Sequence, residues 1–120
     1  MRERQQRNKE LENRLVDFSK KTIDFSVKAP KTAANVILIK QLIRSGTSIA
    51  ANYMEACETL TSKEFVHKIS ISKKESRETI FWLNLISHAN KEMADESNQL
   101  AAECGEFLKI FRSIISKFRN

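Results

Sequence analysis

The chain has 120 residues, enough for one domain but too few for two independent cores. It contains only two glycines and one proline, whereas sheet-rich and loop-rich folds need many turn residues. Long helices are therefore favoured. The longest aliphatic run, residues 36–39, is too short to cross a bilayer, and the charged N-terminus does not resemble a signal peptide. We expect no membrane partner and a cytoplasmic location, with Cys57 and Cys104 as reduced core residues.

The first predicted helix covers residues 8–29, where apolar side chains recur at alternating spacings of four and three along one face. Pro30 ends it, because the residue before a proline avoids helical geometry. The second predicted helix covers residues 32–57, with Thr32 as its cap. Gly46 inside this helix costs about 1 kcal/mol relative to alanine, so we expect another helix to approach closely there.

The third predicted helix covers residues 62–90 and opens with a capping box, in which Thr61 and Glu64 satisfy each other's backbone amides. The fourth covers residues 95–117, with acids at its start and bases at its end, as the helix dipole favours. The connections are short, so consecutive helices should be antiparallel neighbours. The sequence therefore predicts an all-α fold: an antiparallel up-down-up-down four-helix bundle, with residues 1–120 as a single domain.

The chain carries no recognisable catalytic or metal-binding motif. A di-iron bundle needs two Glu-x-x-His motifs, and Glu64 with His67 supplies only one, because His88 has no glutamate three residues before it. Gly-rich phosphate loops and Cys-x-x-Cys pairs are also missing from the sequence. We therefore predict no catalytic residues, no metal, no cofactor and no enzymatic activity.

Two acids, Glu75 and Glu78, lie on an otherwise apolar stripe of the third predicted helix. They could form a general acid/base pair. Alternatively, they could pair with Arg44 of the neighbouring helix, or locally with Lys74, in a partly buried network that fixes the helix register. We favour the second interpretation. The predicted structural network consists of Arg44, Asn52, Glu55, Glu75 and Glu78.

The net charge of +6 suggests an anionic partner, although much of the basic surface is balanced locally. Arg7, Arg14, Lys21 and Lys28 each follow an acid by four residues, which predicts ion pairs along their own helix.

The remaining cations are the candidates for contact with nucleic acid. On the third predicted helix, cations and a phenylalanine share one outward stripe, an arrangement that can bind phosphates and stack on a base. An ordinary solvated surface gives a similar pattern. The candidate nucleic-acid-binding residues are Lys20, Lys73, Lys74, Arg77 and Phe81, and the fourth helix adds Lys109, Arg112 and Arg119.

Residues 41–56 read Gln-Leu-Ile-Arg-Ser-Gly-Thr-Ser-Ile-Ala-Ala-Asn-Tyr-Met-Glu-Ala and contain an Arg-Ser-x-x-Ser-Ile-x-x-Asn core. With Lys-Glu-Phe at 63–65, the run 69–79 and Trp-Leu at 82–83, this stretch resembles the four-helix bundle family named for ribosomal RNA intervening sequences. The resemblance spans residues from about 15 to 115. It implies a ring-shaped pentamer, and a relationship to the accessory variability determinant of diversity-generating retroelements, a basic pentamer that contacts nucleic acid and reverse transcriptase.

The sequence leaves three functions open. The leading hypothesis is a non-catalytic homo-oligomer that binds RNA or DNA through its basic surfaces. The alternative is a protein–protein adaptor or scaffold without nucleic-acid binding. The third and weakest is an enzyme that uses Glu75 and Glu78.

Overall fold

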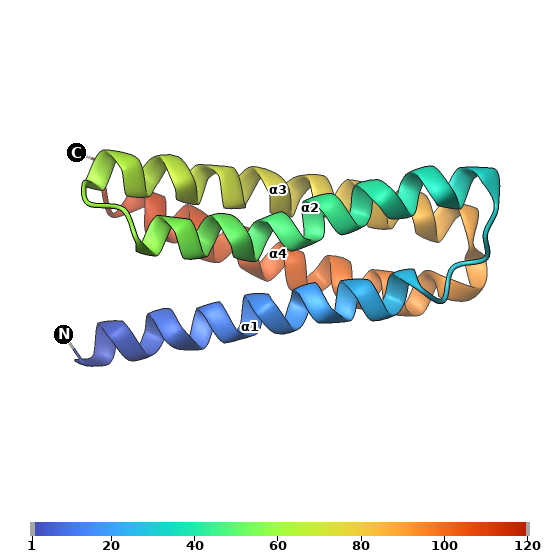
Figure 1. The fold of residues 1–120 in the computed structure, drawn as a ribbon, viewed down its shortest axis with the longest axis horizontal. Helices are drawn as coiled ribbons and strands as arrows, with labels where there is room; N and C mark the ends of the chain where they lie inside the picture. Colours follow the sequence, from blue (N-terminus) through green and yellow to red (C-terminus); the bar gives the residue numbers. More distant parts are fainter. Residues whose placement is uncertain (1, 120) are drawn as a thin grey trace.

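The structure, a computed structural model, describes residues 2–119, with side chains from Asn8 onward. Its four helices form an antiparallel up-down-up-down bundle that measures 47 × 25 × 19 Å (Figure 1). The helices are α1 (Arg2–Ser26), α2 (Ala33–Cys57), α3 (Ser62–Ala89) and α4 (Ala94–Ser116), and a short 3-10 helix, η1 (Lys91–Met93), precedes α4. The predicted all-α four-helix fold is confirmed.

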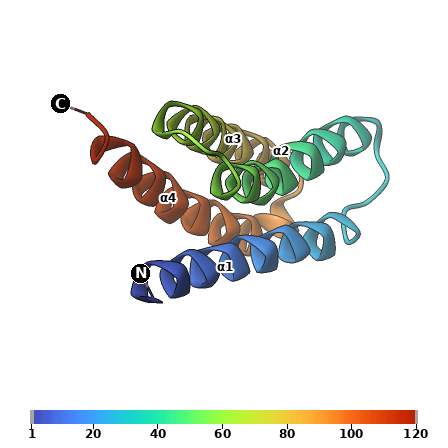
Figure 2. The ribbon, with the colours of Figure 1, turned by 60° about the vertical axis from the view of Figure 1, so that its left-hand side comes forward.

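The helices surround the core in chain order. α2 packs against both α1 and α3, and α3 packs against α4, whereas α1 meets α4 only sparsely. Within the described residues the backbones of α1 and α3 do not approach each other closely, because these helices occupy diagonal corners of the bundle (Figure 2). α1 and α4 diverge toward the end of the bundle at which α1 begins and α4 ends (Figures 1 and 2).

Aromatic side chains from different helices meet in the core. Phe18 of α1 and Phe107 of α4 pack edge to face, with their ring centroids 5.4 Å apart. Tyr53 of α2 lies against Phe111 of α4 at 6.4 Å. All four side chains are buried, and each buried aromatic contributes about 1.5–3 kcal/mol through the hydrophobic effect.

Both predicted N-caps are present. The Oγ1 atoms of Thr32 and Thr61 accept hydrogen bonds from the backbone N–H groups of Asn35 and Glu64, each at 3.1 Å. The capping box differs from the prediction in one bond, because the Glu64 carboxylate accepts the N–H of Leu60, at 3.4 Å, where the prediction had that of Thr61.

The bounds of α1 differ most from those predicted. It begins at Arg2, well before residue 8, because the charged N-terminal residues continue the helix. It also ends at Ser26 instead of residue 29. After Ser26 the N–H groups of Lys28 and Ala29 bond to carbonyls three residues back, so the chain tightens into a turn ahead of Pro30.

Gly46 lies where α1 and α2 approach closely, as predicted. A Cβ atom placed on Gly46 would be 3.0 Å from Cγ2 of Thr22. The prediction for the cysteines is correct for Cys104, which is buried, and wrong for Cys57, which is exposed at the last turn of α2. No helix in the described part of the chain is long and apolar enough to span a membrane.

Candidate functional site

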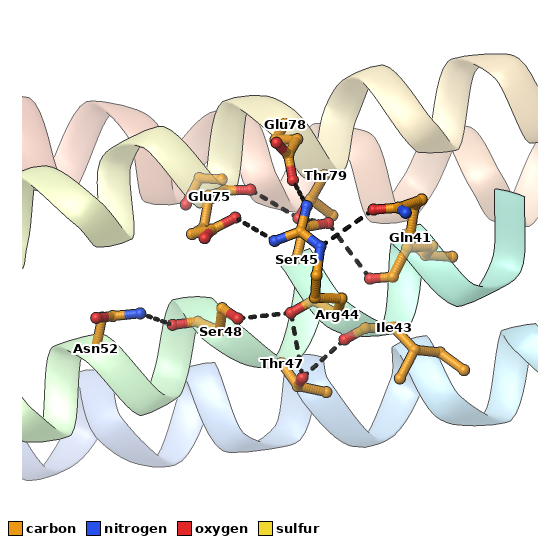
Figure 3. Close-up of polar contacts among 12 residues, drawn as sticks. Gln41, Ile43, Arg44, Ser45, Thr47, Ser48, Asn52, Glu75, Glu78 and Thr79 are labelled. Carbon is orange, nitrogen blue, oxygen red and sulfur yellow. Dashed lines mark hydrogen bonds and ion pairs between the residues drawn. The ribbon is translucent and has the colours of Figure 1, made fainter. Parts of the chain in front are cut away.

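Arg44 of α2 reaches across to two carboxylates of α3 (Figure 3). Its Nη1 atom lies 3.4 Å from Oε1 of Glu75, its Nη2 atom donates to Oε2 of Glu78, and its Nε atom donates to Gln41 at 3.1 Å. The Glu75 side chain is only 13% exposed, whereas that of Arg44 is 47% exposed. One guanidinium group therefore binds both acids that could have formed a catalytic pair.

Buried hydroxyl groups lie beneath this ion pair and hold α2 against α3. Ser72 donates to the backbone carbonyl of Ile49 across the helix contact at 3.1 Å. Thr79 Oγ1 lies 2.9 Å from Ser45 Oγ (Figure 3). Small hydroxyl side chains let two helices approach closely while each hydroxyl group keeps a hydrogen-bond partner. These residues therefore fix the position of α2 against α3.

The other two predicted network residues lie apart from Arg44. Glu55 pairs with Lys68 of α3 at 2.8 Å, further along the contact between α2 and α3. Asn52 donates to the carbonyl of Ser48, in its own helix, at 2.9 Å. The structure thus groups Arg44 with the two α3 acids, gives Glu55 a separate interhelical pair, and leaves Asn52 bonded within α2.

Arg14 and Lys21 of α1 pair with acids of α4, so the ion pairs predicted for them along α1 are wrong. Lys9 does pair within α1, with Glu12 at 3.2 Å. Arg14 binds Glu106 at 2.5 Å and Glu103 at 3.3 Å. The Arg14 pKa is raised, chiefly by the hydrogen bond to Glu106. Lys21 also binds Glu103, at 3.3 Å.

Just after the C-terminal end of α1, Lys28 also pairs with α4, with its Nζ atom 3.0 Å from Oε1 of Glu96. The Arg7 side chain lies outside the described part. These basic side chains pair with α4 because the acids of α4 face α1. The sequence of a single helix cannot reveal that geometry.

These ion pairs draw the acids of α3 and α4 toward α1 and α2. Five carboxylates of α3 and α4 bond to cations of α1 or α2, namely those of Glu75, Glu78, Glu96, Glu103 and Glu106. The outward surface shared by α3 and α4 keeps four cations that form no ion pair within residues 8–119, and Asp95 is exposed near the start of α4.

We call this surface the α3–α4 face and define it by Lys73 and Arg77 of α3 and Lys109 and Arg112 of α4. Within residues 8–119, none of the four forms an ion pair. Lys73 is half-buried, and the other three are exposed.

The register of α3 against α4 is set at both ends of the pair. Ser97 donates to the carbonyl of Leu83 at 2.8 Å, and the rings of Phe65 and Phe118 lie 5.5 Å apart at the opposite end. Because the helices are antiparallel, this register places Lys73 at the level of Lys109. It also places Arg77 at the level of Gly105, one turn away, and the two cationic stripes therefore run side by side.

The remaining sequence candidates divide between this face and another helix. Lys74 and Phe81 are exposed beside the α3 stripe, with Phe81 at 52%. Lys20 is exposed on α1, the helix diagonal to α3, so the structure does not bring it to the α3–α4 face.

Gly105 belongs to the same face and was not singled out from the sequence. A Cβ atom placed there would meet no atom within 4 Å, so packing within the chain does not require glycine at this position. A glycine in the middle of a helix could have served as a signal.

No group of three or more His, Cys, Asp or Glu side chains is arranged to hold a metal ion in the part of the chain that the structure describes. Glu64, the acid of the single Glu-x-x-His spacing, accepts a backbone hydrogen bond at the start of α3 instead.

Residues 7–113 match the family model described as 23S rRNA-intervening sequence protein. The chain belongs to this family. A comparison with curated proteins found no match.

A solved structure supports the assignment to the intervening-sequence family. A protein of unknown function from the S23 ribosomal protein family of Bacteroides thetaiotaomicron is 26% identical in sequence and superimposes with a TM-score of 0.82. The match covers 91% of this chain and 97% of that one.

The motif at residues 44–52, on which the family resemblance was first based, has a structural place in this member of the intervening-sequence family. Arg44 binds the α3 acids, Ser45 lies in the α2–α3 contact, and the side chains of Ser48 and Asn52 bond to carbonyls of α2 itself. The motif thus contributes to the bundle, and the α3–α4 face lies outside it.

Proposed function

We propose that this chain is a non-catalytic homo-oligomeric bundle that binds RNA or DNA through the α3–α4 face. The observation that carries the proposal is the separation of charge. Five acids of α3 and α4 are paired with α1 or α2, while Lys73, Arg77, Lys109 and Arg112 form no ion pair in the described part. Cations that have no carboxylate partner are available to phosphates.

Binding through phosphates makes a specific prediction about salt. Affinity should fall steeply between about 50 and about 200 mM salt, because each neutralised phosphate releases counterions. Replacing Lys73 and Arg77 by glutamine should reduce the slope of log affinity against log salt by about 1.4–1.8, the loss of two contacts. Lys20→Gln removes an exposed cation from α1 and is the matched control.

A second variant tests the same face by adding charge. Gly105→Glu places a carboxylate beside Arg77 at a position where a side chain meets no atom within 4 Å, so the fold should tolerate it. We expect it to weaken nucleic-acid binding, whereas Ala51→Glu, at an exposed position of α2, should leave binding almost unchanged. Equal losses for the two acidic variants would contradict a defined face, and so would a reduction of the salt slope by Lys20→Gln as large as that caused by replacing Lys73 and Arg77.

Self-association is part of the proposal, and exposed aliphatic side chains at the α1–α2 turn support it. Val27 is 78% exposed, Ile37 64%, Val36 61% and Ile23 45%. Apolar groups gathered at one end of a bundle favour burial against another copy. The family resemblance suggests a pentamer, which light scattering would detect as five times the 13.9 kDa chain mass. A monomer that stays monomeric at high concentration would refute this part.

The second candidate function, a protein adaptor, is favoured by a groove of about 680 Å³ between the diverging ends of α1 and α4. Leu11, Tyr53, Phe65 and Ile114 are among the side chains that line it, and its lining is mostly apolar. Retention of a protein partner after nuclease treatment, with no salt-dependent nucleic-acid binding, would favour this function over the first. In either case we expect a cytoplasmic protein, where Cys57 and Cys104 would stay reduced.

A further inference from the structure

Phe81 lies beside the α3–α4 face and is largely exposed, which is uncommon for a phenylalanine. It follows Lys73 and Arg77 at one-turn spacings on α3, and its side chain is 52% exposed. Its ring packs edge to face against the Trp82 indole, with centroids 4.9 Å apart and an interplanar angle of 66°. The Phe81 ring thus contacts Trp82 and also exposes about half of its side chain to solvent.

We propose that the α3–α4 face takes single-stranded nucleic acid and that an unpaired base stacks on the exposed side of Phe81. This inference rests on the proposed function and names the form of its ligand. An aromatic ring beside a row of cations is the combination with which proteins hold single strands, because cations bind the phosphates and rings stack on the bases. A duplex keeps the faces of its bases stacked on one another, so its interior bases cannot use Phe81.

Two neighbouring positions fit a strand that lies close to the helices. Gly105 on α4 carries no side chain at the level of Arg77, so the α4 backbone is bare there. Asn84 is exposed one turn beyond Phe81 on the same side of α3. Its amide can pair with the edge of a base that stacks on the ring.

The test compares a single strand with a duplex. Anisotropy of a labelled oligouridine of about 16 nucleotides, and of an RNA duplex of the same length, would be measured at low salt with the intact chain. Phe81→Leu keeps an apolar side chain but removes the aromatic face. We expect it to weaken single-strand binding about 5- to 150-fold and to leave duplex binding unchanged. Leu60→Ala, a change at a fully exposed apolar side chain in the turn between α2 and α3, is the control and should affect neither.

Tryptophan fluorescence supplies an independent readout. Trp82 is the single tryptophan of the chain and touches Phe81, so its emission should change when the single strand binds to the wild type and not when it binds to Phe81→Leu. The proposal is overturned if Phe81→Leu leaves single-strand binding intact or weakens strand and duplex equally. It is also overturned if the substitution changes the mass of the assembly, since Phe81 would then lie between subunits.

These measurements distinguish a failure of the stacked base from a failure of nucleic-acid binding itself. Salt-dependent binding that is lost with Lys73→Gln and Arg77→Gln but insensitive to Phe81→Leu would leave the proposed function standing and remove the stacked base. No binding of either RNA at low salt would remove both.

Discussion

The side-chain amides of Asn35 and Asn90 bond to each other reciprocally inside the bundle. Each Nδ2 donates to the Oδ1 of the other residue at 2.8 Å. The second N–H of Asn35 bonds to the carbonyl of Pro30 at 2.8 Å, and that of Asn90 bonds to the carbonyl of Ile86 at 2.9 Å. Both residues are buried, so this pair ties the turn before α2 to the C-terminal end of α3.

Replacing either asparagine should therefore leave the other without its buried partner. We expect Asn35→Ala and Asn90→Ala each to lower the free energy of unfolding by about 1–3 kcal/mol, the usual desolvation cost of an orphaned polar group. The double variant should cost clearly less than the two single effects added together. Urea unfolding of all four proteins measures this coupling, and strictly additive effects would contradict a mutual pair.

The contact between Gly46 and Thr22 predicts an effect that depends on the background. Gly46→Ala gains about 1 kcal/mol of helix propensity but brings a methyl group to 3.0 Å from Thr22 Cγ2. Thr22 is fully buried and its hydroxyl donates to the carbonyl of Phe18, so it cannot easily move. Overpacking of this kind costs about 1–3 kcal/mol, and we expect a net loss of stability. Thr22→Ser removes the opposing methyl, and in that background Gly46→Ala should become neutral or stabilising by thermal unfolding.

Gly105 should behave in the opposite way. Gly105→Ala meets no atom within 4 Å, so only the helix propensity changes, and we expect about 1 kcal/mol more stability. The same thermal unfolding series checks both glycines. A destabilised Gly105→Ala would show that another molecule, such as a second copy, packs there in solution.

The ion pair between Arg44 and Glu75 should contribute little to stability. The Arg44 side chain is 47% exposed, so solvent screens its attraction to the carboxylate. A double-mutant cycle with Arg44→Gln and Glu75→Gln should give a coupling below about 1 kcal/mol, and the coupling should shrink further in high salt. A much larger coupling would mean that Arg44 is better shielded in the assembled protein than in the single chain.

Burial of Cys104 and Tyr53 predicts how stability depends on pH. Desolvation raises the pKa of both groups, and the nearby Glu103 carboxylate raises that of Cys104 further. Above about pH 9 the unfolded chain releases protons that the folded chain retains, so the free energy of unfolding should fall as pH rises. Below that pH both states keep these protons and the contribution is complete.

Chemical denaturation at a series of alkaline pH values measures this slope. Cys104→Ala should lower stability at neutral pH, since it creates a small cavity, while making the alkaline slope shallower. An unchanged slope in this variant would show that other groups govern the alkaline loss.

The sequence by itself determined the helices and their order. Thr32 and Thr61 cap helices through bonds to residues three positions away, and the four-three spacing of apolar side chains depends only on helix geometry. Pro30 ends the first helix, and the scarcity of turn residues favours long helices. Both effects depend only on the local sequence. The motif at residues 41–56 was also sufficient to indicate the family, because it is read directly along the chain.

Only the tertiary structure decided which polar groups meet. Arg14 lies four residues after Glu10, yet it bonds to Glu103 and Glu106 of α4, because an interhelical partner competes with the local one. Asn35 and Asn90 are 55 positions apart and become partners only when the bundle closes. The α3–α4 face arises in the same way, since antiparallel packing places Lys73 and Lys109 at the same level. The ion pairs of Glu75, Glu78, Glu96, Glu103 and Glu106 are made with α1 or α2. Such contacts depend on helix register, which the packing of the whole core sets and no local pattern specifies.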